Sequence, residues 1–180
     1  MRRYSMILLM LLACAPAAGN QVRQPSTQEL VERSDLIAVV KAIGCRSDDA
    51  DLHAREVCDV ETTTVLKGDA APSVELITVG QFIELDVDCC ERGASYLVFA
   101  VHGTGSKYGS THGQYGVYRI EDGWISGWRW QGSLVRVEKV LEELDDILGR
   151  TSDVDTLKSA LEPSLMREFS TQQAHEWSMQ

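Results

Sequence analysis

Cys14 is the residue whose chemical role the sequence indicates most clearly, because it stands at the end of a secretory signal. Arg2-Arg3 forms a positively charged start, and Met6–Ala13 is a short apolar core, which is the order of a signal peptide. The core is far shorter than the roughly 20 residues that a membrane-spanning helix needs. Leu11-Leu12-Ala13-Cys14 resembles the bacterial lipobox, in which the signal is cut before the cysteine and the thiol receives diacylglycerol. We therefore expect residues 1–13 to be removed and Cys14 to be the lipid attachment site.

An ordinary cleavable signal is the alternative for the same region. Ala15-Pro16-Ala17 offers a small-x-small site for signal peptidase, and cleavage there would remove Cys14. If Cys14 is lipidated, the residue after it is Ala15 and not the Asp that would favour inner-membrane retention in a diderm bacterium. This favours the outer membrane. We expect a cell-envelope protein whose partner is a membrane, reached through the lipid anchor, with another envelope protein as a second candidate partner.

The charge of the exported part argues against nucleic acid as a partner. The signal contains two of the 17 Lys and Arg and none of the 27 Asp and Glu, which leaves a net charge of −12 after cleavage. Phosphate backbones repel such a chain. With 44% hydrophobic residues, the exported part can bury one core. We expect residues 14–25 to be a lipidated tether and residues 26–180 to form a single domain with a C-terminal helical extension.

The remaining cysteines are even in number, which in an oxidising compartment predicts two disulfides. They are Cys45, Cys58, Cys89 and Cys90. Together with His53 they are soft donors for a metal, but the sequence has no Cys-x-x-Cys spacing. We therefore expect structural bonds and no metal. A redox role for the adjacent pair is the rarer alternative.

Other polar motifs do not meet the requirements of a catalytic or ligand site. One acidic run lacks the glycine and the spaced oxygens of a calcium loop, so a solvated loop is expected. It consists of Glu84, Asp86, Asp88 and Glu91. Gly103–Lys107 has Ser106 before the lysine where a phosphate loop needs glycine, and it reads as a strand connection that extends through Gly116. No nucleophile context such as Gly-x-Ser-x-Gly occurs, so we expect neither an enzyme nor a bound cofactor.

Aromatic residues form the candidate partner surface. Trp124, Trp128 and Trp130 alternate along one predicted strand and therefore share a face. Core packing against the sheet or the C-terminal helix is the favoured interpretation, and a ligand platform is the alternative. If a partner binds, we expect it at this face and at the 103–116 loop, which carries Tyr108 and Tyr115.

These residues are positioned by a chain that reads mainly as strands. Ser26-Thr27-Gln28-Glu29 is a capping box that starts a short helix through about Arg33. Six short apolar or alternating segments without long helices between them predict an antiparallel sheet or barrel. They are Asp35–Ala42, Val57–Leu66, Val74–Val79, Tyr96–Val101, Val117–Ile120 and Trp124–Trp128. Asp122-Gly123 predicts a hairpin turn between the last two, and the polar Arg46–Ala54 stretch predicts a loop.

After Trp130 the apolar period becomes helical. A stripe ending at the stop signal Gly149 predicts the first helix. It consists of Val137, Val140, Leu141, Leu144, Ile147 and Leu148. A second helix is expected from Ser152 or Asp153 to Pro163, and a third, weaker helix from Leu165 to about Ala174.

Three stretches resemble the netrin-module or TIMP-like family (tissue inhibitor of metalloproteinases). They are Ser34–Ala42, Val65-Leu66-Lys67-Gly68, and Cys90 followed by Gly93–Ala100. The similarity covers roughly residues 26–101 and rests on patterns without a catalytic signature. It implies a mainly β fold with flanking helices (α+β), namely a five- to six-stranded antiparallel OB-like barrel plus C-terminal helices.

On such a barrel the four cysteines after Cys14 meet at one end. Cys45 ends the first strand, Cys58 begins the second, and the Cys89-Cys90 pair precedes the fourth strand, which pairs with the first in this family. Adjacent cysteines in an extended chain point to opposite sides, and a vicinal bridge is strained. We therefore favour one bond from each of Cys45 and Cys58 to the adjacent pair. The competitor is Cys45 to Cys58, worth about 3 kcal/mol, with a vicinal or free pair beside it.

The resemblance extends to the fold more than to the mechanism. The inhibitors begin with Cys-x-Cys and chelate the zinc of the protease through the amine and carbonyl of the first cysteine. Here Cys14-Ala15-Pro16 contains no second cysteine, and a lipidated, acylated Cys14 has no free amine. We expect a non-enzymatic interaction or structural module of the envelope. A protease inhibitor or regulator is the alternative.

Overall fold

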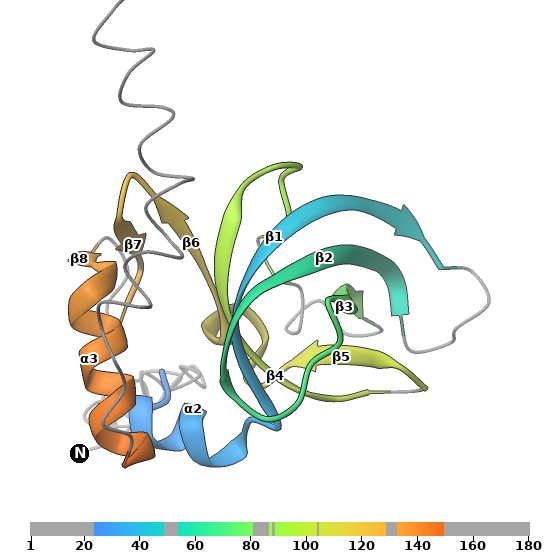
Figure 1. Cartoon of the computed structure of the whole chain (residues 1–180). Coiled ribbons are helices and arrows are strands. Elements are labelled where there is room, and N and C mark those ends of the chain that lie inside the picture. Colours follow the sequence, from blue (N-terminus) through green and yellow to red (C-terminus); the bar gives the residue numbers. More distant parts are fainter. Residues whose placement is uncertain are drawn as a thin grey trace, which may run out of the picture.

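A computed structural model of the chain describes residues 24–48, 54–80, 87, 89–103, 105–128 and 133–149 (Figure 1). Several predictions fall outside these residues: those for Cys14, His53, Glu84, Asp86, Asp88 and Trp130, and the two helices expected after Gly149. No helix within the described ranges is both long enough and apolar enough to cross a membrane.

Five strands close into a barrel. They are β1 (Leu36–Ser47), β2 (Ala54–Lys67), β3 (Ser73–Gly80), β4 (Ser95–His102) and β5 (Lys107–Ser110). The pairing runs β1-β2-β3-β5-β4 and closes through β4 on β1. The predicted mainly β barrel with flanking helices is confirmed in this form. The expectation of a wholly antiparallel barrel is wrong for one pair, because β3 and β5 run parallel.

The strand that links β3 to β4, β5, lies inside the stretch that the sequence predicted to be a loop. Leu76 of β3 is the register partner of Tyr108, and Val101 of β4 is the partner of Gly109. Tyr108 is buried and belongs to the barrel interior. Four residues that include a glycine carry no alternation long enough to identify a strand. β4 precedes β5 directly along the chain, but β3 is distant in sequence, so only the closed barrel explains the pairing of β5 with β3.

Three further strands extend the sheet away from the barrel. They are β6 (Val117–Glu121), β7 (Trp124–Ser126) and β8 (Leu134–Arg136), and the short 3-10 helix η2 (Gly113–Gly116) precedes them. The predicted hairpin is confirmed, with Asp122 at φ 50° and Gly123 at φ 76°, as its two-residue turn requires. β7 ends earlier than predicted, because Gly127 adopts φ 77° and turns the chain.

The polar stretch after Cys45 also differs from its prediction. β1 continues through Ser47 and β2 begins at Ala54, so both ends of the predicted loop are strand. Ser47 pairs with Glu56 in register, and Arg46 forms an ion pair with Asp59 at 2.9 Å. Polar cross-strand pairs of this kind support an exposed two-stranded ribbon that hydrophobic periodicity does not reveal.

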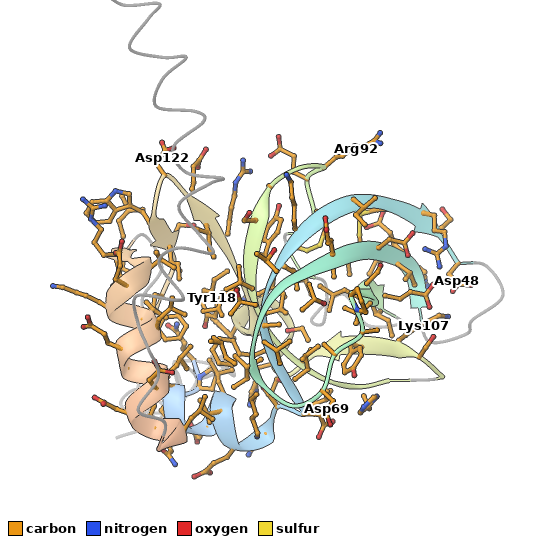
Figure 2. The ribbon with its side chains drawn as sticks, viewed as in Figure 1. Asp48, Asp69, Arg92, Lys107, Tyr118 and Asp122 are labelled. Atoms are coloured by element: carbon orange, nitrogen blue, oxygen red, sulfur yellow. A yellow bond between two sulfur atoms is a disulfide. The ribbon has the colours of Figure 1, made fainter. Side chains whose placement is uncertain are left out.

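The first five residues of β1, Leu36–Val40, are buried on both faces, which explains their apolar run. Leu36, Ala38 and Val40 belong to the cluster inside the barrel, whereas Ile37 and Val39 belong to the cluster beneath the helices. Side chains of successive residues in a strand point to opposite faces, so a strand between two cores needs apolar residues at both parities. Side chains fill the space between barrel and helices, Tyr118 among them (Figure 2).

Two helices cover one side of the barrel (Figure 1). α2 (Thr27–Arg33) begins with the predicted capping box, in which the backbone N–H of Ser26 donates to Glu29 at 2.7 Å. α3 (Val137–Leu148) has the predicted bounds and ends at Gly149 in the left-handed conformation. Its apolar stripe, Leu144 included, joins the cluster beneath the helices. The amphipathic pattern therefore did predict the face that the barrel buries.

Candidate functional site: a pocket beside the four cysteines

The structure pairs Cys45 with Cys58 and Cys89 with Cys90. The favoured prediction, in which each of the first two bonds to the adjacent pair, is therefore wrong, and the competing connectivity holds. The reason is register: Cys45 and Cys58 are direct partners on β1 and β2, with their Cα atoms 4.0 Å apart. A direct cross-strand position already brings two sulfurs within bonding reach.

The vicinal pair lies in the segment that leads into β4, and its backbone there is unusual. Cys90 has φ 138°, a region that L-residues avoid. Such a conformation costs about 1–3 kcal/mol and is retained only where the surroundings hold it. Two backbone bonds hold this segment to β1: Gly93 donates to Ala42 at 2.8 Å, and Ala42 donates to Ala94 at 2.9 Å.

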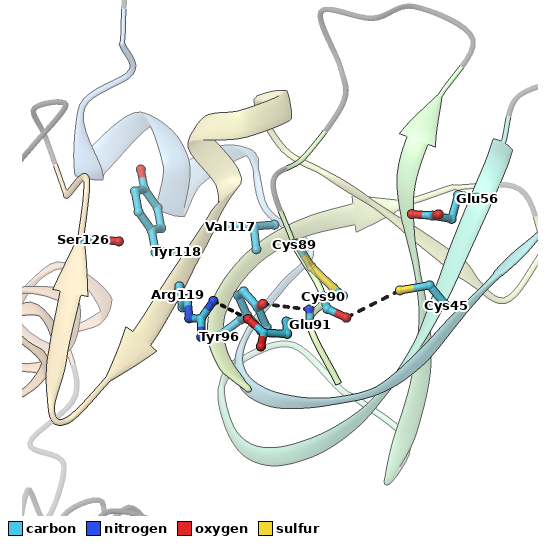
Figure 3. Close-up of a pocket in the computed structure, with 10 residues that line it drawn as sticks. All are labelled: Cys45, Glu56, Cys89, Cys90, Glu91, Tyr96, Val117, Tyr118, Arg119 and Ser126. Atoms are coloured by element: carbon cyan, nitrogen blue, oxygen red, sulfur yellow. Dashed lines mark hydrogen bonds and ion pairs between the residues drawn. A yellow bond between two sulfur atoms is a disulfide. The ribbon is translucent and has the colours of Figure 1, made fainter. Parts of the chain in front are cut away.

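Both disulfides border one pocket of about 550 Å³ (Figure 3). Cys45, Cys89 and Cys90 form one side, and β6 contributes Arg119 from another. The sulfur of Cys45 lies 3.6 Å from the carbonyl oxygen of Cys90. The prediction that the four cysteines meet at one end of the barrel is thus confirmed, although their connectivity was not. A concavity of this size is typical of small-molecule sites.

Glu91 organises the polar wall of the pocket. Its carboxylate accepts a hydrogen bond from Nη1 of Arg119 at 2.6 Å, and its backbone N–H donates to the hydroxyl of Tyr96 at 2.9 Å (Figure 3). This hydrogen bond to Glu91 is the largest cause that raises the pKa of Arg119 above its ordinary value. The Nε of Arg119 is buried and has no hydrogen-bond partner among the described residues. The residue that follows Cys90 therefore links the vicinal pair to β6 and β4.

Glu56 places a carboxylate beside the cross-strand disulfide. Its oxygen accepts a hydrogen bond from Thr78 at 2.7 Å, and the hydroxyl of Thr78 lies 3.5 Å from the sulfur of Cys58. Ligand atoms of Cys45, Glu56 and Cys58 all lie within 4.8 Å of one another. A thiolate must be free to bind a metal, so this donor set is closed while the Cys45–Cys58 bond is intact.

The predicted tryptophan face does not form. Trp124 is 38% exposed and stacks beneath the guanidinium of Arg136 at 4.4 Å, whereas Trp128 is 3% exposed. Trp128 packs on Tyr118 with ring centroids 4.9 Å apart. Because Gly127 turns the chain between the two tryptophans, they lie on different sides. Core packing, the favoured interpretation from sequence, describes Trp128 and not Trp124.

Of the two tyrosines predicted for the partner surface, neither is fully exposed. Tyr108 is buried in the barrel interior, with its ring centroid 4.5 Å from that of His102, and Tyr115 is half-buried. Trp124 instead borders a smaller pocket of about 250 Å³ with Leu134, which is 67% exposed. The exposed apolar surface of this region is therefore at Trp124 and Leu134.

No family model matches this chain, and no curated protein matches it either. The residues of the pocket that sequence reasoning missed include its polar members Glu56, Tyr96 and Arg119. Arg119 stands between two buried residues of β6, and this alternation indicates that its side chain points outward. The alternation does not identify the residues that surround the side chain. The pocket joins segments from both halves of the chain, so no local spacing could reveal it.

Proposed function

We propose that this chain is an exported cell-envelope protein, anchored to a membrane by a lipid on Cys14, whose barrel is a non-enzymatic interaction or structural module. The observation that carries export is the pairing of the four cysteines after Cys14 into two disulfides. Disulfides of this kind persist in oxidising compartments and are rare in the cytosol. The signal pattern before Cys14 agrees with that address.

We further propose that the barrel is OB-like and related to the netrin or TIMP-like module. The pairing order β1-β2-β3-β5-β4, closed on β1, supports this assignment because it is a five-stranded barrel with a crossing connection. Two of the stretches that carry the resemblance also meet in space. Lys67 donates a hydrogen bond to the carbonyl of Ser34 at 2.6 Å, so the two stretches share a structural role.

An interaction role is favoured by the exposed apolar surface at Trp124 and Leu134. Large apolar side chains grouped in this way are a common feature of surfaces that contact another protein. We place the contact with another envelope protein there.

The lipid anchor is tested by Cys14→Ser in cells. The wild-type protein should partition into the detergent phase of solubilised membranes, and the variant should be released from it. Ala15→Ser is the matched control, since it keeps the thiol. Detergent-phase partitioning of Cys14→Ser like that of the wild type would overturn the anchor.

The intact mass of the mature N-terminal peptide gives an independent answer. A diacylglycerol-modified, acylated Cys14 supports the anchor and removes the free amine that the inhibitory alternative requires. A mature chain that begins after Ala17 would overturn the anchor while leaving export intact. A free amine on Cys14 would favour the protease inhibitor.

A further inference from the structure

We propose that the Cys89–Cys90 pair is a thiol–disulfide exchange site that accepts electrons from a dithiol, while Cys45–Cys58 is a structural bond. This goes beyond the proposed function and does not depend on the lipid anchor. Its basis is the different surroundings of two disulfides that border one pocket.

Access to the vicinal pair is through Cys89. Cys89 is half-buried, whereas Cys90 is 5% exposed, and both border the pocket of about 550 Å³ (Figure 3). Exchange begins when a thiolate attacks one sulfur and expels the other. The burial pattern makes the sulfur of Cys89 the point of attack and the sulfur of Cys90 the leaving group.

The backbone gives this pair a reason to open. Cys90 has φ 138°, and breaking the bond to Cys89 removes one of the constraints on that conformation, while the backbone bonds of Gly93 and Ala94 to Ala42 remain. Disulfides that are held under strain are among those that serve labile, regulatory or catalytic roles. An outlying φ at a residue that borders a pocket is the kind of observation from which a functional role is inferred.

The cross-strand pair is held differently. Its flanking residues stay paired in the β1–β2 ladder, with Gly44 opposite Asp59 and Arg46 opposite Val57. The sulfurs would therefore remain neighbours after reduction and close again. Cys45 is exposed, but attack on its sulfur would have to leave a thiolate on Cys58, which is fully buried in the barrel interior. Burial in apolar surroundings disfavours a thiolate. Cys90 is buried in the same cluster, but unlike Cys58 it borders the pocket that also contains Arg119.

The exchange balances with one dithiol. Its first thiolate attacks the sulfur of Cys89, the Cys89–Cys90 bond breaks, and Cys90 leaves as a thiolate that takes a proton from solvent. The second thiolate of the reductant then attacks its own partner sulfur in the mixed disulfide and expels Cys89 as a thiolate, which is also protonated. Two electrons and two protons pass from the dithiol to the pair, and the dithiol becomes a disulfide.

Reduction of the Cys89–Cys90 bond would change the wall of the pocket through Glu91. This residue follows Cys90 directly, binds Arg119 through its carboxylate, and donates its backbone N–H to Tyr96. A change of the backbone at Cys90 therefore moves the group that holds both. The oxidation state of the pair would set the shape of the pocket.

The test is graded reduction of the mature, folded protein with dithiothreitol. Samples are quenched in acid, alkylated under denaturing conditions and mapped by peptide mass. Cys89 and Cys90 should be labelled together at a dithiothreitol concentration about tenfold or more below that which labels Cys45 and Cys58. Labelling of Cys45 and Cys58 first, or of all four cysteines in one step, would overturn the assignment.

Two variants and a trap sharpen this result. The Cys45→Ser, Cys58→Ser double variant should keep the early labelling, and the Cys89→Ser, Cys90→Ser variant should lose it; the wild-type map decides if either variant does not fold. Oxidised glutathione, added to the partly reduced wild type, should form its adduct on Cys89. An adduct on Cys45 instead would contradict the proposal.

Discussion

Lys67, the last residue of β2, is joined to Ser34 by a hydrogen bond of 2.6 Å from its ammonium group to the carbonyl oxygen. The same ammonium donates to the carbonyl of Val31 at 2.7 Å. Both carbonyls belong to the C-terminal end of α2, where a positive charge stabilises the helix dipole and satisfies carbonyls that have no partner within the helix. One side chain thereby fastens the first helix to the barrel.

Replacing Lys67 by Met should lower the free energy of unfolding by about 1.5–3 kcal/mol, because Met keeps the apolar stem but leaves two half-buried carbonyls without their charged donor. Urea unfolding at pH 7 measures the change. Lys41→Met on the exposed face of β1 is the control and should be nearly silent. Equal losses for both variants would mean that the bond contributes no net stability.

Gly68 is predicted to tolerate no side chain. It adopts φ 81°, and a Cβ built on it would overlap the carbonyl oxygen of Asp35. Gly68→Ala should therefore cost more than about 3 kcal/mol in unfolding free energy, since positive φ and a backbone clash add. Gly93→Ala isolates the conformational part, because Gly93 has φ 86° with no atom within 4 Å of such a Cβ. We expect about 1–2 kcal/mol there. Similar losses at both positions would exclude the clash.

Leu144 should be essential to the docking of α3. Its side chain is fully buried in the cluster beneath the helices, so Leu144→Ala should lower the unfolding free energy by about 2–5 kcal/mol. Glu142→Ala, on the exposed face of the same helix, is the control and should change the stability by less than about 0.5 kcal/mol. Thermal unfolding of both variants gives the comparison. Equal, small shifts would show that α3 is not part of the folded unit.

His112 should make the protein less stable in mild acid. Burial, with the nearby Arg33 as a second cause, holds the pKa of His112 below its ordinary value of 6.5, and the guanidinium of Arg33 lies 3.4 Å from Nε2. The unfolded chain then binds more protons than the folded one, so stability falls as the pH drops below about 6.5. Urea unfolding at pH 7.5 and pH 5.5 measures this loss.

His112→Gln should lose less stability than the wild type between these two pH values. Arg33→Gln should reduce the loss as well, because it removes the like charge that protonated His112 would face. A pH dependence identical in all three proteins would refute the contribution of His112.

Local chemistry in the sequence determined the ends and faces of many elements. The capping box at Ser26, the Asp122-Gly123 turn and the stop at Gly149 each act within a few residues of chain, and the structure has all three. The apolar stripe of α3 likewise states which face is buried, since 3.6-residue periodicity is a property of one segment alone. In these places the partner of each group is a near neighbour in sequence.

The tertiary structure decided everything that depends on which distant segments become neighbours. It placed β5 between β3 and β4, paired Cys45 with Cys58 by strand register, put Trp128 in the core, and brought Arg119 to Glu91 beside the vicinal pair. The local sequence around a four-residue strand, a cysteine or an arginine does not identify the strand, cysteine or carboxylate with which it pairs. Those pairings follow from the closure of the barrel, in which all strands must satisfy their backbone bonds at once.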